Sequence, residues 1–90
     1  MIDRRHYGII AFPTSQAAAA AEASVLAAGY ACRLIPMPEQ LSAGCGLVLQ
    51  TILAELSEIR MLLSGQNVSL DGCYEVRFEN RKKFVTEWEG

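Results

Sequence analysis

The first half of the chain alternates apolar runs with one long stretch of small residues. Residues 6–12 form a short apolar run that ends at Pro13, a pattern typical of a strand covered on at least one face. Residues 16–28 are rich in alanine and predict a helix that stops at Gly29. Apolar and polar residues alternate over residues 30–35, which predicts a second strand.

The second half contains a longer apolar pattern. Residues 47–50 predict a third short strand. Leucine and isoleucine then recur at three-to-four residue spacing, which predicts an amphipathic helix over residues 51–64 that stops at Gly65. In an alternative interpretation, the helix extends back to Leu47 and Cys45 lies at its N-terminus, where partial positive charge favours the thiolate.

The remaining pattern completes the fold prediction. Residues 68–78 alternate as a strand or hairpin, interrupted at the turn dipeptide Asp71-Gly72. The order strand, helix, strand, strand, helix, strand predicts an α+β fold: a ferredoxin-like βαββαβ two-layer sandwich, with an antiparallel sheet and two helices on one face. We expect the other face to be solvated unless a partner covers it. We assign residues 1–78 to this single domain and residues 79–90 to a charged C-terminal tail, an extra element or dimer contact.

Composition and charge exclude several classes of function. The formal net charge of −2 and the scattered basic residues give no electrostatic footprint for nucleic acid. No apolar stretch approaches the roughly 18 residues of a membrane helix, so we expect no membrane contact. The apolar run near the N-terminus is too short for a secretory signal and is interrupted by Pro13. We therefore expect a cytoplasmic protein.

The three cysteines are the only candidates for special chemistry. Cys32, Cys45 and Cys73 are odd in number and widely spaced, which fits neither a disulfide framework nor a C-x-x-C motif. We expect reduced thiols. His6 has no partner at metal-ligand spacing, so we predict no metal site and no cofactor.

Cys45 is the cysteine with the most open setting. Gly44 and Gly46 flank it without side chains, and Ser42 is also small. A buried structural cysteine needs no such clearance, because it packs as a small hydrophobe. Arg33 is the nearest basic residue in sequence. We predict a site with Cys45 as the reactive thiol and with Ser42, Gly44, Gly46 and Arg33 as binding residues.

An ordered series of motifs resembles one protein family. The series is Phe12-Pro13-Thr14, an alanine-rich helix ending in Ala28-Gly29, then residues 33–38 (Arg-Leu-Ile-Pro-Met-Pro) and residues 42–46 (Ser-Ala-Gly-Cys-Gly). It is similar to small bacterial selenium/sulfur (Se/S) carrier-like proteins over residues 7–76. The resemblance implies a ferredoxin-like domain whose Cys-Gly cysteine holds selenium or sulfur. This chain departs from the pattern at Glu39 and Gln50, where similar sequences often have basic residues.

Three functions fit the residues. In the leading hypothesis, Cys45 carries sulfur or selenium as a persulfide or selenopersulfide between a desulfurase-type donor and an acceptor protein. The alternative is a non-catalytic protein-interaction or small-ligand-binding regulatory domain. A stand-alone thiol enzyme is less favoured than a carrier or accessory protein, because the base beside the sulfur would have to be His6, the only histidine. An exposed sheet edge makes a homodimer a further expectation.

Overall fold

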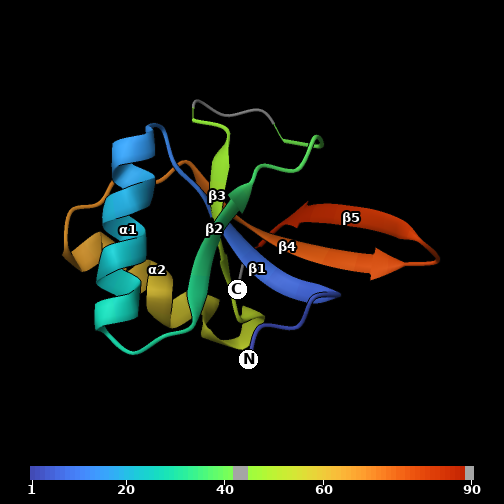
Figure 1. The fold of residues 1–90 in the computed structure, drawn as a ribbon, viewed down its shortest axis with the longest axis horizontal. Coiled ribbons are helices and arrows are strands. Elements are labelled where there is room, and N and C mark those ends of the chain that lie inside the picture. Colours follow the sequence, from blue (N-terminus) through green and yellow to red (C-terminus); the bar gives the residue numbers. More distant parts are fainter. Residues whose placement is uncertain (42–44, 89–90) are drawn as a thin grey trace.

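One antiparallel sheet and two helices make up the fold (Figure 1). The computed structural model describes residues 1–41 and 45–88. The elements, in chain order, are β1 (His6–Ala11), α1 (Ser15–Ala27), β2 (Cys32–Pro36), β3 (Leu47–Thr51), the short 3-10 helix η1 (Leu53–Glu55), α2 (Leu56–Gly65), β4 (Gly72–Glu79) and β5 (Lys82–Glu87). Neither helix of the described residues is long and apolar enough to cross a membrane.

The strands lie in the order β2-β3-β1-β4-β5, and every neighbouring pair is antiparallel. The prediction of an α+β fold with an antiparallel sheet and two helices is therefore confirmed. The sheet also has a fifth strand beyond the four of the predicted ferredoxin-like pattern. Asn80 and Arg81 both have positive φ angles, which is the geometry of a tight two-residue hairpin, and this turn returns the chain to pair β5 with β4.

Helix α1 begins and ends as its sequence predicts. The Thr14 hydroxyl accepts a hydrogen bond from the backbone N–H of Ala17 at 3.1 Å, which satisfies a donor at the helix N-terminus. Gly29 follows the helix with φ of +92°, a conformation that glycine adopts without steric cost. The buried residues of the helix are Ala18, Ala21 and Val25, so small side chains set its distance from the sheet.

Helix α2 begins at Leu56, five residues later than predicted. Thr51 belongs to β3, where it is buried, pairs with Gly8 of β1, and donates its hydroxyl to the Gly8 carbonyl at 3.5 Å. Gly8 lets the helix approach, because a Cβ there would lie 2.9 Å from Leu56 Cδ2. The alternative in which the helix extends back to Leu47 is wrong, since residues 47–51 are a strand.

The last predicted strand is shorter at its start than the sequence pattern suggests. Strand β4 begins at Gly72, so the Asp71-Gly72 dipeptide does not interrupt a hairpin. Instead, the backbone N–H of Asp71 donates to the carbonyl of Ala11 at 2.7 Å and brings the chain alongside β1. The hairpin of this region lies between β4 and β5 and extends away from the helices (Figure 1).

The centre of the sheet is buried on both faces. The helix-side core is formed by Ile10, Phe12, Ala18, Ala21, Val25, Leu49, Leu56, Ile59, Leu63 and Cys73. The opposite face has a second core of Tyr7, Ile9, Ala11, Val48 and Val76. Met37 and Leu41 from the proline-rich segment, residues 36–41 from the end of β2 onward, and Ile2 from the N-terminal segment pack against this second core. The expectation of a solvated second face is therefore wrong at its centre, because the chain itself supplies a cover.

Candidate functional site

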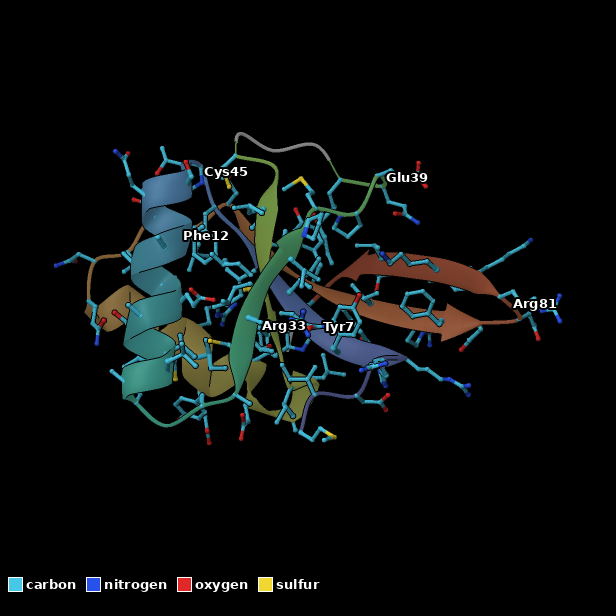
Figure 2. The ribbon with its side chains drawn as sticks, viewed as in Figure 1. Tyr7, Phe12, Arg33, Glu39, Cys45 and Arg81 are labelled. Carbon is cyan, nitrogen blue, oxygen red and sulfur yellow. The ribbon has the colours of Figure 1, made fainter. Side chains whose placement is uncertain are left out.

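Cys45 lies in a turn immediately before β3. Its side chain is half-buried and packs against the helix-side core, and its Sγ donates to the carbonyl of Leu47 at 3.4 Å. Figure 2 shows this side chain at the end of the sheet where α1 begins. The thiol is therefore held at the boundary of the core rather than inside it.

Gly46 gives this turn its shape. Its φ of +73° lies in the left-handed region, which a residue with a Cβ adopts only with strain. A Cβ at this position would meet no atom within 4 Å, so the space beside Cys45 is open here. The carbonyl of Gly46 accepts a hydrogen bond from the backbone N–H of Met37 at 2.9 Å, which ties the turn to the proline-rich segment. Two other predicted site residues, Ser42 and Gly44, lie outside the described residues.

Arg33 does not meet Cys45. It lies in β2 opposite Gln50, whereas the end of β2 nearest the turn is Pro36, which pairs with Leu47. Three residues along a strand separate these positions by about 10 Å. Arg33 also points to the face opposite Cys32, and Figure 2 shows it well apart from Cys45. The structure therefore places the predicted basic residue at a different part of the surface.

The other two thiols belong to the helix-side core, Cys73 within it and the half-buried Cys32 packed against it. Cys73, in β4, is only 8% exposed, and burial raises the pKa of its thiol. Burial also raises the pKa of Cys32, with a further contribution from the negative charge of Glu22. The Sγ of Cys32 points to the backbone carbonyl of Glu22 at 3.9 Å. Both environments disfavour the thiolate, which is the nucleophilic form.

The single histidine is paired elsewhere. The Nε2 atom of His6 contacts a carboxylate oxygen of Glu75, across the pairing of β1 with β4. His6 begins β1, whereas Ala11, at the other end of the strand, pairs with Val48 beside the Cys45 turn. His6 is therefore at the wrong end of β1 to act as a base for Cys45. Among residues 1–41 and 45–88, no cluster of three or more His, Cys, Asp or Glu side chains could hold a metal ion.

Comparison with known protein families shows the family to which this chain belongs. A family model described as "Putative Se/S carrier protein-like" matches residues 7–75, a range that includes Cys45 and runs from Tyr7 in β1 to Glu75 in the middle of β4. The chain belongs to this family. No curated protein and no solved structure matches the chain.

The sequence of this Se/S carrier-like protein did not indicate a second group of polar residues, which lines a cavity away from Cys45. Arg33 lines an open cavity together with Arg4 and Gln50. Strand alternation could have placed Arg33 on the face opposite Cys32. It could not have brought in Arg4, which precedes the first strand and has no periodic neighbours.

Proposed function

We propose that this protein carries sulfur or selenium on Cys45, as a persulfide or selenopersulfide, between a donor protein and an acceptor protein. The observation that supports this most is the difference among its thiols. Burial disfavours the thiolate of Cys32 and Cys73, whereas Cys45 lies at the core boundary beside open space at Gly46. Membership of the Se/S carrier-like family agrees with such a role.

The transfer requires two thiolate exchanges and no net redox change. Cys45 first loses its proton to solvent, and its thiolate attacks the terminal sulfur or selenium of a donor persulfide or selenopersulfide. The donor's bond to that atom breaks, and the donor leaves as a thiolate. In the second exchange, a thiolate of the acceptor attacks the same terminal atom and becomes the new persulfide or selenopersulfide. The bond between this terminal atom and the Cys45 sulfur breaks, and Cys45 leaves as a thiolate.

The neighbours of Cys45 have a passive part in this proposal. Gly46 leaves room for the approach of a partner's sulfur. We extend the same role to Ser42 and Gly44 on their sequence alone, because both side chains are small. Arg33 has no part in the transfer, since it lies away from the thiol.

The fold and location complete the proposal. Strands β1 to β4 with α1 and α2 follow the chain order of a ferredoxin-like domain, and we propose that β5 is an addition to it. Cys32, Cys45 and Cys73 are all free thiols, which suits the reducing cytoplasm. A desulfurase-type donor suits the chemistry. We propose a carrier or accessory protein rather than a stand-alone enzyme, because His6 lies at the end of β1 that is distant from the Cys45 turn. A homodimer stays a prediction.

Intact-protein mass spectrometry tests the proposal. The full chain is incubated with a cysteine desulfurase and cysteine, or with a selenocysteine lyase and selenocysteine, and then weighed with and without a reductant. We expect a gain of one sulfur or one selenium atom that the reductant removes. The gain should be lost in Cys45→Ala and kept in Cys32→Ala and Cys73→Ala, which are matched controls because each removes one thiol.

Two outcomes would contradict the carrier function. One is equal loading of all three cysteines, which would mean that the turn confers no selectivity. The other is no loading of any cysteine while the donor enzyme is itself charged. Either result would leave the non-catalytic ligand-binding or protein-interaction domain as the better hypothesis.

A further inference from the structure

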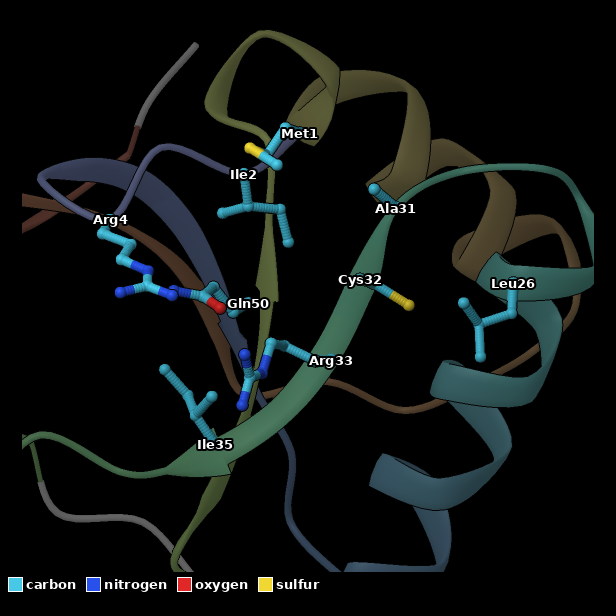
Figure 3. A pocket seen from close by; sticks show the side chains of 9 residues that line it. All are labelled: Met1, Ile2, Arg4, Leu26, Ala31, Cys32, Arg33, Ile35 and Gln50. Carbon is cyan, nitrogen blue, oxygen red and sulfur yellow. The ribbon is translucent and has the colours of Figure 1, made fainter.

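A cavity of about 560 Å³ opens between the N-terminal segment and β2, remote from Cys45. Its lining includes Ile2 and Arg4 from the N-terminal segment, Arg33 and Ile35 from β2, and Gln50 from β3. Figure 3 shows the side chains of Arg4, Gln50 and Arg33 on the same side of β2, whereas the sulfur of Cys32 points the opposite way, towards Leu26 of α1. The polar part of the cavity is therefore formed by two guanidinium groups and one amide.

The charges at this cavity are of one sign. None of its lining residues is acidic. The ion pairs among the described residues join His6 to Glu75 and Arg77 to Glu79, and neither includes Arg4 or Arg33. Both arginines are exposed, so each keeps its N–H donors available to a ligand. Two cationic groups without a neutralising partner favour the approach of an anion.

We propose that this cavity binds the phosphate monoester of a small molecule, with Arg4, Arg33 and Gln50 holding the phosphate. A phosphate monoester carries close to two negative charges at neutral pH and presents three acceptor oxygens. Two guanidinium groups match that charge and can bind oxygens in pairs. A single carboxylate would use one guanidinium and leave the other uncompensated. The double charge therefore favours phosphate over carboxylate.

The apolar part of the lining fits the organic group of such an ester. Ile2 and Ile35 lie beside the arginines, and Met1 extends this apolar wall. The volume falls within the range of about 300–1,000 Å³ that small-molecule sites occupy. Free phosphate would leave this wall unused. An ester with an apolar or aromatic group would cover it.

This site is independent of the proposed transfer at Cys45. Arg33 and Gln50 pair with each other within the β2–β3 ladder. Cys45 lies just before Leu47, the first residue of β3, at the other end of that ladder. Ligand binding should therefore persist when Cys45 is removed. Its success or failure says nothing about whether Cys45 carries sulfur.

An NMR titration of the full chain at about pH 7.5 tests the proposal, because a phosphate monoester is then mainly a dianion. The probes are phenyl phosphate, inorganic phosphate and phenol. We expect saturable shifts of the Gln50 side-chain amide and the Arg4 and Arg33 Nε–H signals with phenyl phosphate. Inorganic phosphate should bind more weakly at the same signals, and phenol should give no saturable shift.

Variants distinguish binding in this cavity from non-specific attraction of the phosphate to positive charge. Arg33→Gln and Arg4→Gln should each weaken phenyl phosphate binding about tenfold or more, the effect of losing a charge-assisted hydrogen bond. Arg77→Gln, which removes an exposed arginine from β4, and Cys45→Ala should leave the affinity unchanged. Equal weakening by Arg77→Gln, or no saturation with phenyl phosphate, would overturn the site. Equal affinity for inorganic and phenyl phosphate would overturn the assignment to an ester.

Discussion

Cys73 and Cys45 both lie on the helix side of the sheet, but their side chains differ in burial. Cys73 lies in the middle of the sheet, opposite Ile10 of β1, and forms part of the helix-side core. Cys45 packs only against the boundary of that core, in a turn whose next residue is exposed. The comparison shows that the same side chain is fully packed in one region and half-buried in the other, because its position relative to the strands rather than its residue type sets the burial.

The largest expected effect comes from the region of Cys73. Ile10→Ala should lower the free energy of unfolding by about 2–5 kcal/mol, because it leaves a cavity in a fully buried part of the core. Chemical denaturation measures the loss. Leu47→Ala is the matched control from the Cys45 region, and it should cost less because Leu47 is only half-buried. Equal losses would mean that the two regions are packed alike.

Serine substitutions sharpen the contrast between the two cysteines. Cys73→Ser should cost about 1–3 kcal/mol, since it places a hydroxyl in a buried apolar site. Cys45→Ser should change the free energy of unfolding by at most about 0.5 kcal/mol, because a half-buried hydroxyl can reach water and can still donate to the Leu47 carbonyl. Denaturation of the two variants under the same conditions measures the difference. A costlier substitution at Cys45 would contradict the comparison.

The backbone of the turn provides a smaller test. Gly46→Ala should destabilise the protein by about 1–2 kcal/mol through strain at its positive φ, although the added methyl meets no atom. Gly65→Ala is the control, because Gly65 ends α2 at a φ outside the left-handed region and also has open space around it. Alanine there should be neutral or slightly stabilising in the same thermal or chemical denaturation. A harmless Gly46→Ala would show that the turn does not need this conformation.

The smallest effect is a dependence of stability on pH. Burial raises the pKa of the Cys73 and Cys32 thiols in the folded state, so the unfolded chain releases these protons at lower pH. The stability from these neutral thiols is fully present below the unfolded pKa of about 8.5 and is lost as the pH rises through the folded pKa. Denaturation above and below this pH should show the decline. Cys32→Ala/Cys73→Ala should reduce it, and an unchanged decline in that double variant would contradict this cause.

The sequence was sufficient to predict the elements with clear local signals. The apolar run that ends at Pro13 and the alanine run that ends at Gly29 predicted β1 and α1 closely. The start of α2 was wrong because leucines and isoleucines continue through β3 into the helix, and this periodicity does not show that Thr51 is paired with Gly8. Local pattern alone cannot separate a buried strand from the helix that follows it.

The remaining differences come from contacts distant in sequence. Strand β5 is charged and lies at the sheet edge, and its turn has Arg81 rather than glycine at a position of positive φ, so the usual hairpin signal is missing. The site residues around Cys45 stay predictions, except that the structure separates Arg33 from this cysteine. Cys45 and Gly46 followed from small neighbours in the sequence, but the position of Arg33 depends on the β2–β3 register, which separates it from Cys45.

Timed alkylation tests most directly whether Cys45 is the thiol available for transfer. The native protein is treated with limiting iodoacetamide, and the labelled cysteine is identified by peptide mass spectrometry at successive times, with denatured protein as the control. We predict that Cys45 is labelled well before Cys32 and Cys73 in the native protein and that all three are labelled at similar rates after denaturation. Native labelling of Cys73 or Cys32 as fast as Cys45 would contradict the assignment of Cys45 as the carrier thiol.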